Sequence, residues 1–117
     1  MNTKLIGAYG EQLAARYLRG EKYKILAANY RAGTGEIDII AEKRKVICFV
    51  EVKTRKEGAL VSGIDAVDSN KQQRLNLAAL DYITRTRCEK QPRFDVAEVY
   101  LQESGKLRID YLENAFT

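Results

Sequence analysis

Two neighbouring strand-like stretches most constrain how this chain can fold. Residues 36–42 (EIDIIAE) and 46–54 (VICFVEVKT) are rich in isoleucine and valine, and the charged segment KRK at 43–45 joins them. Branched apolar residues in short runs of this kind are typical of strands that pack into a sheet. The two stretches therefore predict a buried β-hairpin, yet both carry acidic residues where an ordinary strand would carry valine or threonine.

The charged residues of the hairpin are expected to meet on one face. Side chains alternate along a strand, so Glu51 and Lys53 point the same way. An even-numbered loop, such as Arg44-Lys45, places Asp38 directly opposite Glu51, whereas a slip of one residue turns it to the other face. Two carboxylates so placed lie roughly 5 Å apart at Cβ and repel each other. A bound divalent cation would make the pair tolerable, and Lys53 is the local counter-charge.

The rest of the chain predicts two helices and three further strands around this hairpin. Apolar residues recur at helical intervals in residues 2–20 and again in the segment that starts at residue 69. SNKQ at 69–72 has the form of a capping box at the start of that second helix. The predicted elements are a helix at 2–20, a strand at 23–30, a loop at 31–35, an irregular segment at 57–67, a helix from 69, and strands at 93–102 and 106–112 around a turn at 103–105. Gly33 and Gly35 are expected to provide turn geometry in the loop that leads into the next strand. This order predicts a single domain, 1–117, of the α/β or α+β class, with a mixed sheet flanked by helices.

Composition narrows the classes of protein that the chain can belong to. Of its 117 residues 45% are apolar and 31% charged, which is typical of a soluble domain. The longest apolar run, 46–50, is too short to cross a membrane, and Glu11 and Arg16 interrupt the pattern that a signal peptide would need. Two cysteines do not make a disulfide framework, so a reducing, cytoplasmic setting is expected.

The absence of histidine excludes whole classes of catalytic site. The chain has none, which removes Ser-His-Asp and Cys-His chemistry and histidine-based metal binding. Any catalysis must rest on carboxylates, lysine or hydroxyl groups. The 20 Lys and Arg residues outnumber the 16 Asp and Glu, and they cluster at 43–45, 53–56, 71–74 and 85–87. A basic surface of this kind suits a nucleic acid, and scattered solubilising charge is the alternative.

The acidic hairpin also resembles a known family pattern. Asp38, twelve intervening residues, Glu51-Val52-Lys53 and a glutamate on the first helix, Glu11, resemble the PD-(D/E)xK signature. That superfamily includes the restriction endonucleases and the archaeal Holliday junction resolvases. The stretches GAYGEQLAARYL, GEIDIIA, FVEVKTR and KQQRL, with RFDV further on, resemble the bacterial YraN-like proteins from about residue 4 to residue 112. Ile37, and not the proline in the name of the signature, precedes Asp38. Many members of the superfamily likewise lack the proline.

The resemblance and the residue chemistry together assign a metal-assisted site. Hydrolysis of a phosphodiester needs charge neutralisation at the phosphate and a positioned water, which Mg²⁺ or Mn²⁺ can provide. Asp38 and Glu51 are assigned as direct ligands, and the resemblance implies the Val52 carbonyl as a third. Lys53 would orient the attacking water and stabilise charge, because neighbouring carboxylates oppose a lowered lysine pKa. Glu11 would bind the metal through water.

Other charged residues are assigned more peripheral roles. Arg55, Lys71 and Arg74 are candidate phosphate contacts, with solvated surface positions as the alternative. Glu36 shares a face with Asp38, where a solvated or structural role is favoured over a helper role. Asp95 is expected to fix local structure by pairing with an arginine.

Two functions follow as expectations. The first is a metal-dependent nuclease that hydrolyses DNA, with a restriction endonuclease-like core and, by resemblance to the resolvases, branched or structured DNA as the first substrate class. The alternative is a catalytically weak nucleic-acid-binding or interaction module of a repair, uptake or recombination complex. Retention of Asp38, Glu51 and Lys53 argues against the alternative, since a non-catalytic protein has no use for a repulsive carboxylate pair. A homodimer or a protein partner is compatible with both.

Overall fold

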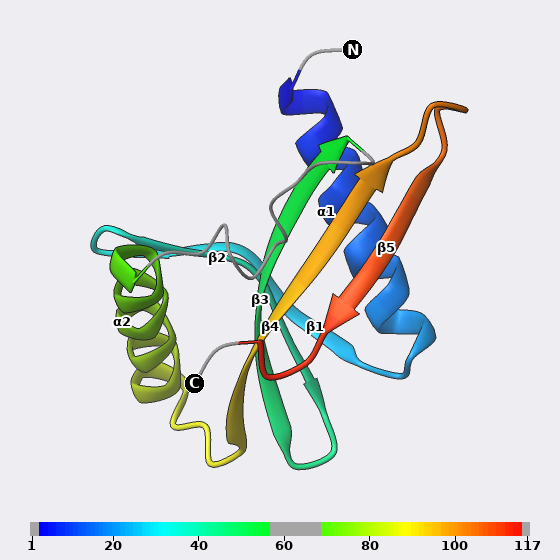
Figure 1. The fold of residues 1–117 in the computed structure, drawn as a ribbon. Helices are drawn as coiled ribbons and strands as arrows, with labels where there is room; N and C mark the ends of the chain where they lie inside the picture. The colour runs from blue at the N-terminus through cyan, green and yellow to red at the C-terminus, as the bar shows by residue number, and fades with distance from the viewer. Residues whose placement is uncertain (1–2, 57–68, 116–117) are drawn as a thin grey trace.

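The structure is a computed structural model, and it describes residues 3–56 and 69–115. Its element order, helix, three strands, helix, two strands, is the predicted one (Figure 1). The elements are α1 (Thr3–Gly20), β1 (Lys24–Ala32), β2 (Gly35–Lys43), β3 (Val46–Lys56), α2 (Ser69–Thr86), β4 (Gln91–Leu101) and β5 (Leu107–Leu112). The irregular segment predicted at 57–67 lies outside the described residues.

The five strands form one mixed sheet in the order β1-β2-β3-β4-β5. Among the strands of the described residues, only β3 and β4 pair in parallel, and the other neighbours are antiparallel. A parallel pair needs a crossover connection, and α2 lies in the chain between these two strands. The prediction of a mixed sheet flanked by helices is confirmed. Neither helix in the described part of the chain is long and apolar enough to cross a membrane.

The two helices cover opposite faces of the sheet (Figure 1). On one face Leu75 and Ala78 of α2 pack with Ile47 and Phe49 of β3. On the other, Ala14 and Leu18 of α1 belong to a second buried cluster. That cluster takes the alternate residues of β3, Cys48 and Val50. Burial on both faces explains why this strand begins as an unbroken apolar run.

The β2–β3 hairpin has the even-numbered loop that the acidic pair requires. Lys43 pairs with Val46 across a two-residue connection, and Arg44 in it adopts a φ of 55°. The recorded register then runs to Ile39 opposite Val50. The next residues along the two strands are Asp38 and Glu51. The predicted two-residue loop is therefore confirmed, and so is the register as far as Ile39 and Val50.

Glycines allow both helices to approach the sheet closely beside this hairpin. A Cβ atom on Gly10 of α1 would overlap the Thr54 hydroxyl of β3, and one on Gly35 of β2 would overlap the Arg74 carbonyl of α2. Turn geometry was expected at Gly33 and Gly35. Gly33 does have a positive φ of 58°, but Gly35 is required for helix packing instead.

Candidate metal centre and active site

The Asp38 carboxylate is anchored to the backbone of the neighbouring strand. Its Oδ2 accepts a hydrogen bond from the Val52 N–H at 2.8 Å, just beyond the last recorded pair of the β2–β3 ladder. The side chain thus occupies a position where the next ladder bonds of β3 would form. This bond holds Asp38 beside Glu51, as the predicted register requires.

Glu51 is a buried carboxylate with two lysines on one oxygen. Its side chain is 6% exposed, and Lys53 Nζ lies 3.3 Å from Oε1. Lys71 Nζ, from the first turn of α2, contacts the same oxygen. The pairing of Glu51 with Lys53 on one face of β3 is confirmed. The Lys71 contact was not foreseen, because that lysine had been assigned to a phosphate of the substrate.

The electrostatics of Asp38 show that the carboxylate pair is strained. Burial, followed by the negative charge of Glu51, raises the pKa of Asp38 to about 7, although the Val52 N–H bond acts to lower it. Glu11 and Glu36 add smaller upward contributions. The repulsion inferred from the sequence therefore persists in the fold, because both lysine contacts go to Glu51.

The two lysines of the site differ in the direction of their pKa shifts. Burial lowers the pKa of Lys53, and the neighbouring Lys71 lowers it further, against the opposing effect of Glu51. Burial also acts to lower the pKa of Lys71, but its contacts with Glu51 and Lys53 outweigh this and the pKa is raised. The sequence argument expected the neighbouring carboxylates to oppose a lowered pKa of Lys53. Glu51 does oppose it, but burial and Lys71, which the motif did not show, outweigh this effect.

Glu11 reaches the same region from α1, as expected. Burial raises its pKa, Glu36 and Glu51 raise it too, and a hydrogen bond with Asn29 lowers it. Glu11 and Asp38 line two adjoining cavities. One, of about 470 Å³, also contains Glu51 and Lys53. The other, of about 500 Å³, follows α1 toward β1.

The remaining predicted contacts divide between those inside and outside these cavities. Arg55 lines the first, and its Nε is buried without a hydrogen-bond partner among the described residues. Arg74 is exposed and, within the described ranges, lines neither of the two. Glu36 is exposed, and its Oε1 lies 3.7 Å from Arg31 Nε, which agrees with a solvated role.

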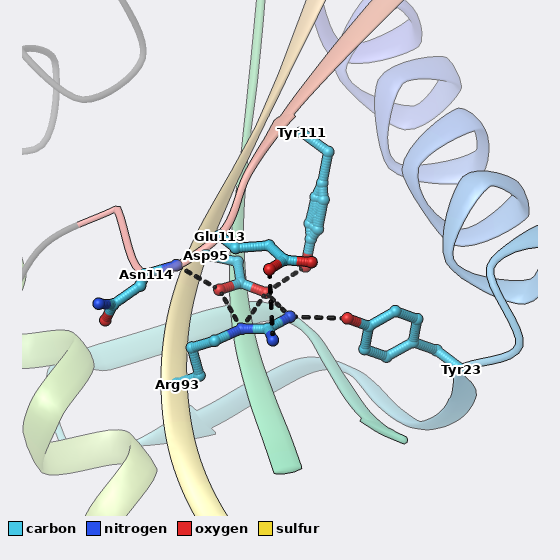
Figure 2. A network of polar contacts seen from close by, with 6 residues as sticks. All are labelled: Tyr23, Arg93, Asp95, Tyr111, Glu113 and Asn114. Carbon is cyan, nitrogen blue, oxygen red and sulfur yellow. Dashed lines mark hydrogen bonds and ion pairs between the residues drawn. The ribbon is translucent and has the colours of Figure 1, made fainter. Parts of the chain in front are cut away.

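Asp95 is a structural carboxylate, as predicted. It is fully buried, and Figure 2 shows it at the centre of a polar network. Arg93 donates from Nε to Oδ1 and from Nη2 to Oδ2, both at 2.9 Å. Tyr111 OH donates to Oδ2 at 2.6 Å and the Asn114 N–H to Oδ1 at 2.9 Å. Both oxygens are thus occupied by donors from the protein itself.

The donor set at Asp38 and Glu51 fits a small, hard cation that keeps part of its water. Within residues 3–56 and 69–115, no three His, Cys, Asp or Glu side chains are grouped closely enough to form a metal cage. Mg²⁺ is usually held by one or two carboxylates with several waters, so a complete cage is not required. The pair agrees with that pattern, with Glu11 near enough to affect the pKa of Asp38.

Comparison with known proteins shows to which family this chain belongs. The model of the family described as "Uncharacterised protein family UPF0102" matches residues 10–99. The chain is similar to a UPF0102 protein of Alkaliphilus oremlandii, with 47% identity over 99% of this chain and 100% of the relative. It is also similar to UPF0102 proteins of Caldanaerobacter subterraneus, 42% identical over 99% of this chain and 98% of the relative, and of Geobacter metallireducens, 42% identical over 99% and 95%. The chain therefore belongs to the UPF0102 family.

Proposed function

We propose that this protein is a divalent-metal-dependent nuclease that hydrolyses phosphodiester bonds in DNA, with a restriction endonuclease-like core of the PD-(D/E)xK superfamily. One observation carries the proposal. The Val52 N–H holds Asp38 beside Glu51, and Lys53 of the same strand contacts Glu51. Asp38 forms no ion pair among the described residues, and it lies beside a second carboxylate and a lysine whose pKa is lowered. Such a cluster in a cavity is typical of catalytic sites rather than of structural ion pairs.

The proposed roles follow from the contacts of each side chain. Asp38 and Glu51 would hold the cation, and Glu11 would contribute from α1 through a water. Bound Mg²⁺ or Mn²⁺ would neutralise charge on the phosphate and lower the pKa of a bound water. Because its own pKa is lowered, Lys53 can orient the attacking water and also accept its proton at Nζ.

Lys71 and Arg55 are assigned to the substrate phosphate. Lys71 stays charged, since its pKa is raised, and its ammonium lies on the Glu51 oxygen that the cation would share. Arg55 lines the same cavity with an unused Nε–H donor among the described contacts. Both can donate to a phosphate oxygen next to the carboxylates. Both cysteines are free, which agrees with a cytoplasmic setting for the proposed enzyme.

The two lysines on Glu51 also support the alternative function, a catalytically weak nucleic-acid-binding module. With Lys53 and Lys71 on Glu51, that carboxylate is neutralised without any metal. A site that stays in this state would bind a phosphate backbone and cut nothing. Asp38 favours the nuclease over this reading, because neither lysine contacts it in the described structure.

The deciding experiment is a cleavage assay on labelled linear duplex, single strand, flap and four-way junction DNA in Mg²⁺, Mn²⁺ or EDTA. We expect metal-dependent cutting that falls by about 10²-fold or more in Asp38→Asn and in Lys53→Met. Glu89→Gln and Lys45→Gln are matched controls, because both side chains are exposed and line neither of the two cavities among the described residues.

Three other results would decide against the nuclease. Cutting that survives in both site variants would belong to a contaminating enzyme. Binding without cutting in every metal would place the module reading first. Equal loss in the control variants would show a general effect of charge rather than a catalytic site.

A further inference from the structure

We propose that the groove along α1, lined by Gln12, Arg16 and Arg19, binds the phosphate backbone of the substrate strand on one side of Asp38. This inference rests on the proposed function and adds to it a binding track on a helix that carries none of the phosphate contacts assigned so far.

The groove is continuous with the candidate metal centre. Its volume is about 500 Å³, and α1 lines one wall with Glu11, Gln12, Arg16 and Arg19. Ile25 and Ala28 of β1 and Asp38 of β2 line the other wall. Because Glu11 and Asp38 also line the cavity that holds Glu51 and Lys53, the acidic centre stands where the two cavities meet.

The spacing of the three polar residues fits a linear polyanion. Gln12, Arg16 and Arg19 follow one another at intervals of four and three, so they lie on one face of the helix. From Glu11 to Arg19 the helix rises roughly 12 Å. That length matches about three or four nucleotides of a duplex strand, which advances about 3.4 Å per step.

The two arginines differ from several others on the surface in having no carboxylate partner. Arg31, Arg85 and Arg108 each form an ion pair with a neighbouring Glu or Asp. Arg16 and Arg19 are exposed, and neither forms an ion pair with any residue in the described ranges. Arg19 lies in the last turn of α1, where a cation also favours the helix dipole, but Arg16 lies inside the helix and gains nothing from that effect.

A strand that reaches Asp38 needs positive charge on both sides of the acidic centre. The carboxylates of Glu11, Asp38 and Glu51 repel a phosphate, so flanking cations must hold it there. On the β3 side, Arg55 and Lys56 line the cavity. On the other side, the only cations that line the groove in the described part of the chain are Arg16 and Arg19. The track therefore places the scissile phosphate between two cationic segments.

The test is binding of a fluorescent DNA strand and its duplex in EDTA, which separates binding from cutting. Dissociation constants would be measured between about 50 and 300 mM salt for the wild type, Arg16→Gln/Arg19→Gln and a control. Lys45→Gln/Arg87→Asn removes the same charge at exposed positions that, among the described residues, line neither cavity, and Asn tolerates the φ of 54° at residue 87.

Removal of two phosphate contacts should weaken binding roughly fivefold to tenfold per arginine and lower the salt slope by about 2. The control should keep the wild-type slope. Cleavage by the α1 variant should show a raised KM with kcat nearly unchanged, since the reacting groups stay in place. Thermal unfolding of both double variants would show that each is folded.

The inference and the proposed function fail in different ways. An unchanged slope in the α1 variant, or an equal change in the control, overturns the binding track while cleavage by the wild type still supports the nuclease. A wild type that neither binds nor cuts any DNA overturns both. If the wild type binds DNA without cutting it, and the salt slope of binding is lowered only in the α1 variant, the binding track is supported and the nuclease is overturned.

Discussion

Asp38 is the residue at which stability and function oppose each other. Its pKa is raised from 3.8 to about 7, so between these values the folded chain holds a proton that the unfolded chain has lost. The free energy of unfolding then falls as the pH rises from about 4 to about 7, and it stays low above that. The charged carboxylate thus destabilises the metal-free protein at neutral pH, and a bound cation would compensate its charge.

We therefore predict that Asp38→Asn stabilises the metal-free protein above pH 7, by about 1–3 kcal/mol. Asparagine keeps an oxygen that can accept the Val52 N–H bond but carries no charge to be buried. The gain should shrink as the pH falls toward 4 and vanish below about pH 3, where Asp38 is protonated in both states. Urea unfolding in EDTA at several pH values would measure it.

Asp110→Asn is the matched control, because Asp110 is an exposed carboxylate paired with Arg108. It should leave the pH dependence of unfolding almost unchanged. A variant Asp38→Asn that is less stable than the wild type at pH 8 would contradict the interpretation of Asp38 as an uncompensated charge.

At the residue scale, the sequence predicted the part of the site that lies within one hairpin, but not the contact made from another element. Asp38, Glu51 and Lys53 lie within one hairpin, so strand alternation and loop length were enough to bring them together. Lys71 stands twenty residues beyond Glu51, and its contact depends on where α2 docks. Periodicity could assign that lysine to a helix start but not to a partner, and the lowered pKa of Lys53 was hidden for the same reason.

At the scale of elements, the position of α2 depends on a glycine in β2, which has no side chain. Gly35 faces the Arg74 carbonyl and the Ala78 methyl group, and a Cβ there would overlap the backbone of the helix. The helix backbone cannot move aside as a flexible side chain would. This contact also sets the distance from α2 to β3, and with it the reach of Lys71 to Glu51.

Gly35→Ala should therefore cost about 1–3 kcal/mol of stability through overpacking and should displace the start of α2. Gly20→Ala is the control, because nothing lies within 4 Å of a Cβ at that position. Chemical denaturation would measure both variants, and the ¹⁵N-NMR chemical shifts of the Lys71 and Glu51 amides would report the displacement. An alanine at 35 that is as stable as the wild type would show that the helix can shift without cost.

At this scale the sequence predicted the order and bounds of the elements well but not how closely they dock. The amphipathic pattern of 2–20 and the alternation of 93–102 both led to the right elements, with bounds within two residues of those observed. Gly35 was expected to serve a turn, because a single sequence cannot distinguish a glycine needed for its φ from one needed for its lack of a side chain.

At the scale of the whole molecule, one buried and one half-buried carboxylate, Asp95 and Asp38, separate stability from function. Asp95 lies on the α1 side of the sheet, where its network joins Tyr23 before β1 to Tyr111 and Asn114 at the end of the described chain (Figure 2). Asp38 accepts one backbone hydrogen bond, and the charges of nearby carboxylates act on it against the opposing charge of Lys71. The first is satisfied by the protein and the second is not.

The same substitution should therefore have opposite effects at these two positions. Asp95→Asn places an amide group against the Arg93 and Tyr111 donors and leaves a buried cation without its partner. We expect a loss of about 2–5 kcal/mol, with Mn²⁺ affinity unchanged under conditions in which the variant is folded. Asp38→Asn should instead stabilise the metal-free chain and abolish Mn²⁺ binding.

Urea unfolding together with electron paramagnetic resonance of Mn²⁺ would separate the two effects. Mn²⁺ should also raise the free energy of unfolding of the wild type and of Asp95→Asn by the same amount at a given concentration, because binding stabilises only the folded state. If Asp95→Asn lowered the affinity and Asp38→Asn did not, the cation would belong to the Asp95 network instead. The lack of protein donors around Asp38 would then need an explanation other than a metal.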